Sequence, residues 1–302
     1  DIDGYQIGEA QQVEHGRPAV APVPPVVDGK LFLRWDRDFE SVMGDMTIQS
    51  VYTDAVVELG AATDFAEIFD NVPDPRVVYK LTADVTWPSD WTSRSFEATL
   101  DGQGHVISYT AKTPLFSDLY GTAANFILDG TDGESRTSIT GINTTFGFLA
   151  RQVIGGTVSG VTIRNFLSEL SGSANYINDG GLCGTAGNGA LIENCTIESN
   201  VLIRTRLSYA GGLVGSVYMS DGWGVGEQDL TVLEIRGCTN RADICTFSSG
   251  DANLGGILAL ADANDAARRP RILIADCVNF GNFTMTYTSG IGGHFGGIVA
   301  ER

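Results

Sequence analysis

The chain has 302 residues, of which 43% are hydrophobic, and it carries 37 acidic residues against 19 lysines and arginines. The formal net charge of −18 excludes the basic footprint of a nucleic-acid-binding protein and disfavours binding to anionic lipid. No apolar run approaches the roughly 20 residues that a transmembrane helix needs, so the composition predicts a large core under an acidic surface.

Residues 1–28 are polar and then rich in proline, which is typical of an extended leader or tether. A small β element and a capping segment are expected over residues 29–76, with strands at 31–35 and 46–59. Residues 63–71 are predicted to form a short amphipathic helix that covers the open end of the structure that follows.

Residues 77–302 contain a repeat. A glycine pair, or one glycine flanked by apolar residues, is followed by small or aliphatic residues and returns every roughly 30 to 45 positions. These anchors occupy residues 146–150, 180–184, 211–215, 254–259 and 295–300. Glycine is expected here because the backbone turns or approaches its neighbour too closely for a Cβ.

Between the anchors a second element recurs, with two informative columns. The first column holds residue types that accept positive φ at low cost, and it predicts a repeated bend: Asn125, Gly160, Asn194, Gly237 and Asp276. The second column holds apolar or small side chains and predicts an interior ladder: Phe126, Val161, Cys195, Cys238 and Cys277. Together the columns predict coils that stack parallel strands on one another.

The five cysteines are interpreted as buried thiols. A metal or redox site is the alternative, but the sequence contains no Cys-x-x-Cys and no histidine at ligand spacing.

Residues 79–87 and 96–107 carry a family resemblance. They read Tyr-Lys-Leu-Thr-Ala-Asp-Val-Thr-Trp and Phe-Glu-Ala-Thr-Leu-Asp-Gly-Gln-Gly-His-Val-Ile. This pattern resembles the opening coil of bacterial surface proteins with a right-handed parallel β-helix. The Gly-Gly-Leu-Val-Gly at 211–215 and the Asn-Cys pairs are similar to the GLUG repeats of the same group, many of which come from Bacteroides.

The resemblance covers about residues 77–300 and implies an all-β, right-handed parallel β-helix. Because the group includes adhesin-like and secreted proteins, it also implies a location outside the cell or on the outer cell surface. Attachment through a lipid or another surface anchor upstream of residue 1 would fit such a location. The insertions between anchors are longer than in the short repeats of the group.

Two sets of residues are candidates for ligand binding. Tyr218 and Trp223 place two aromatic rings in a glycine-flanked loop, where they could stack on sugar faces, and simple loop packing is the alternative. Asp129, Asp132 and Glu134 supply alternating carboxylates of the kind that bind Ca²⁺. A plain acidic turn is the alternative, since the segment is too short for an EF-hand loop.

Two classes of function follow from this sequence. The first is a non-catalytic, adhesin-like protein that binds a glycan or an extracellular protein, such as a host matrix protein, through lateral loops. The second is a β-helix carbohydrate-active enzyme, a polysaccharide lyase or hydrolase. No catalytic residue is predicted, because no two acids align on adjacent coils and His105 lies in an architectural motif. A structural Ca²⁺ is the one cofactor considered. A flat threonine array of the ice-binding type is not expected, because the threonines do not recur in register.

Overall fold

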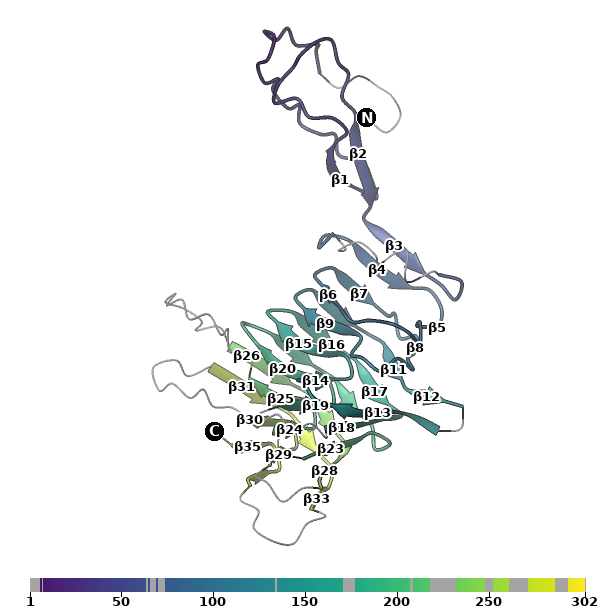
Figure 1. Cartoon of the computed structure of the whole chain (residues 1–302), viewed down its shortest axis with the longest axis vertical. Helices are drawn as coiled ribbons and strands as arrows, with labels where there is room; N and C mark the ends of the chain where they lie inside the picture. Colours follow the sequence, from purple (N-terminus) through teal and green to yellow (C-terminus); the bar gives the residue numbers. More distant parts are fainter. Residues whose placement is uncertain are drawn as a thin grey trace. The chain divides into compact units, whose positions relative to one another are not determined.

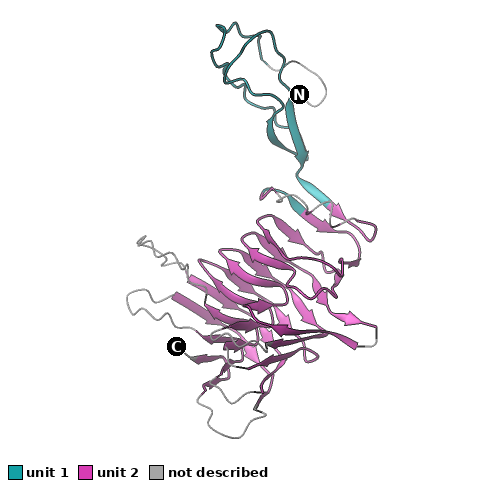
Figure 2. Ribbon diagram, viewed as in Figure 1, with its two compact units in different colours: residues 1–57, 76–78 teal, residues 58–75, 79–302 magenta. Residues whose placement is uncertain are grey.

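The computed structural model describes residues 6, 8–63, 65, 69, 74–133, 135–170, 177–206, 209–217, 232–247, 252–260, 271–285 and 293–301. The chain forms two compact units, residues 1–57 with 76–78 and residues 58–75 with 79–302 (Figure 2). The division predicted at residues 28 and 76 stays a prediction.

The smaller unit is built on a two-stranded antiparallel sheet. Strand β1 (Lys30–Trp35) pairs with β2 (Ser50–Asp54). Phe32 lies 5.2 Å from Trp35 and 5.8 Å from Tyr52 between ring centroids. Between residues 6 and 57, Ser50 is the only described residue that is buried, at 9% exposure, so this part of the unit has no hydrophobic core of its own.

The larger unit is all-β in its described elements, and its strands repeat in the same order coil after coil (Figure 1). Sheet 1 contains β3 (Val56–Leu59), β4 (Val78–Leu81), β7 (Thr99–Asp101), β10 (Thr122–Ala124), β16 (Thr157–Ser159), β21 (Leu191–Glu193), β26 (Val232–Arg236) and β31 (Arg271–Ala275). Sheet 2 contains β5 (Val85–Thr86), β8 (Val106–Ser108), β11 (Ile127–Asp129), β17 (Thr162–Arg164), β22 (Thr196–Ile197), β27 (Thr239–Asn240) and β32 (Val278–Asn279).

Three further sheets complete the coils, with strands of sheets 3 and 4 present from the coil of β10 onward. Sheet 3 contains β12 (Thr131–Asp132), β13 (Ser135–Ile142), β18 (Phe166–Leu170), β23 (Leu202–Thr205), β28 (Asp243–Thr246) and β33 (Phe283–Met285). Sheet 4 contains β14 (Phe146–Gly147), β19 (Asn178–Gly180), β24 (Tyr209–Gly211), β29 (Asn253–Gly255) and β34 (Phe295–Gly296). Sheet 5 contains β6 (Arg94–Phe96), β9 (Phe116–Leu119), β15 (Ala150–Ile154), β20 (Cys183–Gly187), β25 (Val214–Val217), β30 (Leu258–Leu260) and β35 (Val299–Glu301).

Successive coils pair in parallel and in register. In sheet 1, Val158 pairs with Ile192, Ile192 with Ile235, and Ile235 with Ile274. Equivalent residues therefore form columns that run along the stack. This arrangement of several parallel sheets is consistent with a parallel β-helix, and the right-handed sense of the coil stays a prediction.

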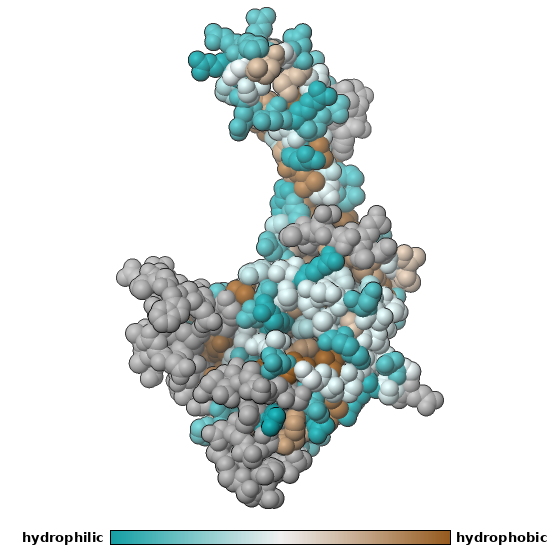
Figure 3. Space-filling view, viewed as in Figure 1, coloured by the Kyte–Doolittle hydropathy of each residue, from teal (hydrophilic) through white to brown (hydrophobic). Residues whose placement is uncertain are grey.

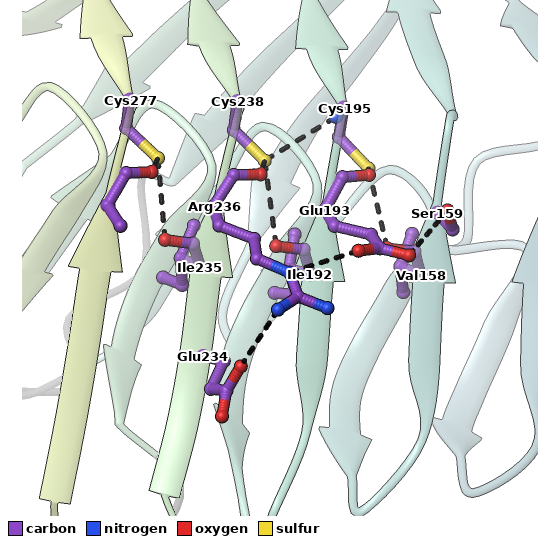
Figure 4. Close-up of polar contacts among 11 residues, drawn as sticks. Val158, Ser159, Ile192, Glu193, Cys195, Glu234, Ile235, Arg236, Cys238 and Cys277 are labelled. Carbon is purple, nitrogen blue, oxygen red and sulfur yellow. Dashed lines mark hydrogen bonds and ion pairs between the residues drawn. The ribbon is translucent and has the colours of Figure 1, made fainter.

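The interior is lined by these columns. Phe126, Val161, Cys195 and Cys238 are buried, whereas Cys277 in the last coil is half-buried. In Figure 4 the three cysteine thiols point the same way, each towards backbone carbonyls; the Cys238 thiol lies 3.3 Å from the Arg236 oxygen and 3.7 Å from the Ile192 oxygen. Each thiol thus behaves as a small interior side chain with weak polar contacts.

The chain passes from sheet 1 to sheet 2 through a left-handed residue. The φ values at the five bend positions are 58° at Asn125, 63° at Gly160, 54° at Asn194, 61° at Gly237 and 53° at Asp276. Only glycine, asparagine and aspartate accept this conformation at low cost, and only these types occupy the column.

The glycine pairs form the turn from sheet 4 to sheet 5. A Cβ on the first glycine would meet the carbonyl oxygen of its own turn, as Gly211 would at 1.8 Å from Val214 O. A Cβ on the second glycine would meet the next coil, as Gly212 would at 2.1 Å from Gly256 O. Both distances are far below a real contact, and the pairs at 180–181, 211–212 and 255–256 are each fixed by two such steric demands.

The capping helix predicted over residues 63–71 is not supported: the described elements include no helix, and residues 64, 66–68, 70 and 71 lie outside the described residues. Two side chains of this segment are nonetheless placed. Phe65 and Phe69 are buried, with ring centroids 4.3 and 5.5 Å from that of Trp87. Among the described residues, no helix is long and apolar enough to cross a membrane.

Candidate functional site

Insertions enter the stack at particular corners of the coil. Two corners keep a constant length of two residues in the five successive coils from β10 onward, although the corner between sheets 1 and 2 is longer in the two earlier coils, at residues 82–84 and 102–105. The corner between sheets 1 and 2 comprises residues 125–126, 160–161, 194–195, 237–238 and 276–277. The corner between sheets 4 and 5 comprises residues 148–149, 181–182, 212–213, 256–257 and 297–298. Left-handed bends define the first corner in these coils, and a glycine opens the second corner in four of the five, with Phe148 at the equivalent position in the other.

Two other corners vary widely in length. Between sheets 5 and 1 the connection is residues 120–121, 155–156 or 188–190 in early coils, but residues 218–231 and 261–270 in later ones. Between sheets 3 and 4 it ranges from residues 206–208 to residues 286–294. The two long connections between sheets 5 and 1 follow neighbouring strands, because β25 pairs with β30 and β26 pairs with β31.

The predicted aromatic pair belongs to one of these long connections. Tyr218 and Trp223 fall in residues 218–231, which lie outside the described residues. The strand that follows is β26. Its Glu234 and Arg236 form a polar strip with Ser159 of β16 and Glu193 of β21 on sheet 1 (Figure 4). Glu234 and Arg236 of this strip therefore follow the insertion directly in sequence.

The polar strip is linked across three coils. The Ser159 hydroxyl donates to Glu193 Oε1 at 3.1 Å. Arg236 Nε donates to Glu193 Oε2 at 3.1 Å, and its Nη1 lies 3.5 Å from Glu234 Oε2. Arg236 is half-exposed, so the strip offers solvent both a guanidinium and carboxylate oxygens. Such a surface can hydrogen-bond to hydroxyl or amide groups of a ligand, but it holds no pair of free carboxyls for acid–base chemistry.

The Glu193–Arg236 pair is one of four equivalent pairs between coils. In each of them the acid lies on one coil and the arginine on the next: Asp118–Arg151 at 2.7 Å, Asp129–Arg164 at 2.7 Å, Glu169–Arg204 at 2.6 Å and Glu193–Arg236 at 3.1 Å. These pairs add modest stability at the surface and consume four of the cations of an acidic chain.

The calcium candidate Asp129 is already surrounded by donors. Its Oδ1 accepts from Thr131 N, Thr131 Oγ1 and Asn165 Nδ2 at 2.9, 2.6 and 2.8 Å. Its Oδ2 accepts from Arg164 Nε at 2.9 Å. Burial raises the pKa of Asp129, but the hydrogen bonds from Asn165, Thr131 and Arg164 outweigh it and hold the pKa below its usual value.

A cation at this turn would have to displace Arg164. Asp132 is exposed, and Glu134 lies outside the described residues. Within the described part of the chain, no group of three or more His, Cys, Asp or Glu side chains could hold a metal ion. Calcium binding here stays a prediction.

His105 is paired with a carboxylate near the start of the stack. Its Nδ1 lies 3.3 Å from Asp84 Oδ1, which also accepts from Val106 N at 2.9 Å. The hydrogen bond from the Val106 amide, more than the contact with His105, holds the pKa of Asp84 below its usual value. Asp84 thus ties the coil containing β5 to the coil containing β8. Like the four acid–arginine pairs, the Asp84–His105 pair joins one coil to the next.

The expectation that threonines do not recur in register is wrong. On sheet 1, Thr122 pairs with both Thr99 and Thr157. On sheet 2, Thr196 pairs with both Thr162 and Thr239. The second set was visible in the sequence, since each of its members lies two residues after a bend residue. Each ladder extends over three coils, and all six threonines are half-buried.

Sequence reasoning also missed a fully buried carboxyl group. Asp179 on β19 has no exposed surface and accepts a hydrogen bond from Ser168 Oγ at 2.8 Å through Oδ2. Its Oδ1 accepts none from any described residue. Burial raises the pKa of Asp179 to about 8, against the smaller opposing effects of Ser168 and the Gly180 amide. The group is therefore protonated in the folded chain at neutral pH.

Comparison with protein-family models finds no match, and comparison with curated proteins finds none either. Among solved structures, the chain has a likeness to the "crystal structure of a putative immunoglobulin A1 protease from Bacteroides ovatus". The identity is 16%, the TM-score is 0.39, and the match covers 75% of this chain and 77% of that one. A likeness at this level carries no inference about activity or ligand.

Proposed function

We propose that this chain is a non-catalytic, adhesin-like binding module of the outer cell surface or the extracellular space. In this proposal a right-handed parallel β-helix presents lateral insertions to a glycan or an extracellular protein. The observation that carries it is the difference between the corners: from the coil of β10 onward two keep a length of two residues, and two accept insertions.

The glycine turns between sheets 4 and 5 are rigid. At Gly212, for example, a Cβ would lie 2.1 Å from the Gly256 carbonyl oxygen, so this turn cannot change without rebuilding the coil. A corner that instead grows from residues 155–156 to residues 218–231 tolerates length and sequence change. Binding residues usually lie on such loops, because a rigid scaffold positions them while their sequence varies.

The long connections 218–231 and 261–270 follow neighbouring strands, so a ligand could span both insertions. Tyr218 and Trp223 would supply stacking surfaces, and the polar strip of Ser159, Glu193, Glu234 and Arg236 would supply donors and acceptors for the same ligand. The acidic net charge favours neutral or basic partners over nucleic acid and anionic lipid.

A binding screen on the intact chain tests the proposal. The chain is applied to a glycan array and to a panel of extracellular matrix proteins, and the best ligand is titrated. The double variant Tyr218→Ala/Trp223→Ala is expected to weaken that binding at least about tenfold. Tyr120→Ala is the matched control, because it removes an exposed aromatic ring from the same corner of an earlier coil.

A parallel arm separates binding from catalysis. The same preparation is incubated with uronic-acid polymers, and reducing ends are counted. Turnover in this arm, or the absence of any ligand that the double variant binds more weakly, would contradict the proposed function.

A further inference from the structure

Sheets 4 and 5 face each other across successive coils. A Cβ on Gly184 of β20 would lie 2.4 Å from Thr145 Cγ2 and 2.8 Å from Phe146 O, both on the preceding coil. A Cβ on Gly215 of β25 would lie 2.8 Å from the amide nitrogen and from the carbonyl oxygen of Asp179, again on the preceding coil. Sheet 5 of one coil therefore packs closely against sheet 4 of the coil before it, and glycine permits this approach.

The sheet 4 side of this contact carries an aromatic ring between two amides. Asn178 pairs with Tyr209, and Tyr209 pairs with Asn253, on three successive coils. The residue that follows each of them is fully buried in the interior. Because side chains alternate along a strand, these three side chains face away from the interior, and all three are half-buried.

The sheet 5 side carries a column of small polar side chains. Gln152 pairs with Thr185, and Thr185 pairs with Ser216. The residue that follows each of them is buried in the interior, so this column also faces outwards. Thr185 and Ser216 each directly follow a glycine of the contact with sheet 4, and each is only 5% exposed.

One of these buried hydroxyl groups has no partner in the part of the chain that the structure describes. Thr185 Oγ1 neither donates a hydrogen bond to a described residue nor accepts one from it. Buried polar groups in folded proteins are nearly always hydrogen-bonded, because an unpaired hydroxyl costs stability. A ligand that lies along the contact between the two sheets would supply the partner.

The seam between the two sheets is defined by five residues: Asn178, Tyr209, Asn253, Thr185 and Ser216. It offers amide donors and acceptors, two aliphatic hydroxyls and one aromatic ring. None of the five carries a charge, although the chain as a whole is strongly acidic. The hydroxyl groups of a sugar match the amides and hydroxyls, and an aromatic ring stacks on the apolar face of a pyranose.

The charges beside the seam are already paired. In the sheet 5 column Asp118 pairs in register with Gln152, and Arg151 Nη2 donates to Asp118 Oδ1 at 2.7 Å. Since no seam residue is cationic, the seam offers no partner to the carboxylate of a uronic acid. Its chemistry therefore favours an uncharged glycan over an acidic one.

We propose that the seam binds an extended, uncharged glycan chain that runs along the stack. Tyr209 stacks on one pyranose ring, and Asn178 and Asn253 hydrogen-bond to hydroxyl groups on either side of it. Thr185 donates a hydrogen bond to a sugar oxygen. Successive coils lie about 4.8 Å apart, so a polymer of similar units meets similar contacts at each coil. This inference rests on the proposed binding function and narrows it to one ligand class and one part of the molecule.

Titration of the intact chain with linear oligosaccharides tests the proposal. The probes are cellohexaose, xylohexaose and mannohexaose, with hexagalacturonate as the acidic comparison, and calorimetry measures the binding. At least one neutral hexasaccharide is expected to bind at one site per chain, more tightly than its own disaccharide and more tightly than hexagalacturonate. Tyr209→Ala should weaken that binding at least about tenfold, whereas Tyr209→Phe keeps the ring and should stay within about threefold of the parent.

Thr185→Val separates a ligand contact from a structural one. Because the hydroxyl has no described partner, its removal is expected to leave the melting temperature unchanged or higher. The same variant should weaken glycan binding about threefold to tenfold. Thr205→Val is the matched control: Thr205 in sheet 3 has no exposed surface, and its hydroxyl also lacks a described partner. Glycan binding by this control should equal that of the parent.

Different results overturn this proposal and the proposed function. Binding of a protein ligand but of no neutral hexasaccharide, or tighter binding of hexagalacturonate, would overturn the seam alone. Glycan binding unchanged in Tyr209→Ala or in Thr185→Val would do the same. Glycan binding that these two variants weaken and Tyr218→Ala/Trp223→Ala leaves intact would support the seam and contradict the insertion as the binding site. A chain that binds neither glycan nor protein would overturn both.

Discussion

The two compact units differ in how much side-chain surface they bury. In the smaller unit Val20, Val23 and Val26 are 74%, 86% and 101% exposed, and Figure 3 shows hydrophobic atoms at its surface. In the larger unit apolar side chains stack in columns, and the neighbouring coils bury them. Both units contain similar residue types, so the difference lies in their arrangement.

Repetition explains this difference. A coil that carries apolar residues at fixed positions buries them against the coils on either side, and each added coil closes the one before it. A two-stranded hairpin has no such neighbour and is marginally stable alone. Prolines at 18, 22, 24 and 25 also prevent the exposed valines from joining a sheet. We therefore expect mutations to act very differently in the two units.

Glycine substitution should give the largest contrast between them. Gly212→Ala places a Cβ 2.1 Å from Gly256 O and 2.4 Å from Asn240 Cγ, and is expected to cost more than about 4 kcal/mol. Gly44→Ala in the smaller unit meets nothing within 4 Å and should change stability by less than about 0.5 kcal/mol. Denaturant midpoints measure both, and equal effects would remove the contrast.

The buried carboxyl group of the larger unit should make its stability depend on pH. Asp179 has a folded pKa of about 8, above the unfolded value of 3.8, so the folded chain holds a proton that the unfolded chain releases. The contribution of Asp179 is fully present below pH 3.8 and is lost as the pH rises to about 8.

The size of this effect follows from the pH range. At 1.36 kcal/mol per unit, the stability of the parent should fall by about 4 kcal/mol between pH 4 and pH 7 relative to Asp179→Asn. Urea unfolding of both proteins at several pH values gives the difference. Parallel pH profiles for the two proteins would show that Asp179 is ionised or solvated in the folded state.

The cysteine ladder should respond more weakly. Cys238→Ser buries a hydroxyl group, but the nearby Arg236 and Ile192 carbonyl oxygens can accept its hydrogen bond. We expect a loss of about 1 kcal/mol in denaturant unfolding, at the low end of the cost of a buried hydroxyl. Cys245→Ser, at a half-buried position, serves as the control and should cost less. Equal losses in the two variants would indicate that burial does not set the cost.

The smallest effect is expected in the smaller unit. Val23→Ser removes an apolar side chain that is already 86% exposed, so the free energy of unfolding should change by less than about 0.5 kcal/mol. A loss above about 1 kcal/mol, measured by thermal or denaturant unfolding, would mean that Val23 is covered in solution.

The repeat was predictable because its physical demands are local. A left-handed bend accepts few residue types, and a turn under a carbonyl accepts only glycine, so Asn194 and Gly212 mark their own conformations. The column of small residues after each bend follows from the same spacing. These features predicted stacked coils, though not where each strand begins and ends.

Other features depend on contacts that no local pattern encodes. Asp179 looks like any loop acid in the sequence, and only the fold places it inside the coil beside Ser168. Asp129 looked like a cation ligand because its partner Arg164 lies a full coil away in sequence. The threonine ladder on sheet 1 was hidden because the connections between its members differ in length.

Native-state hydrogen exchange of the intact chain tests most directly the claim that stacking, and not local sequence, supplies the stability. The amides of β20, β25 and β30 are expected to exchange last and together, through global unfolding. Those of β1 and β2 should exchange much faster, through local opening. Equal protection of β1 and β20 would contradict this account.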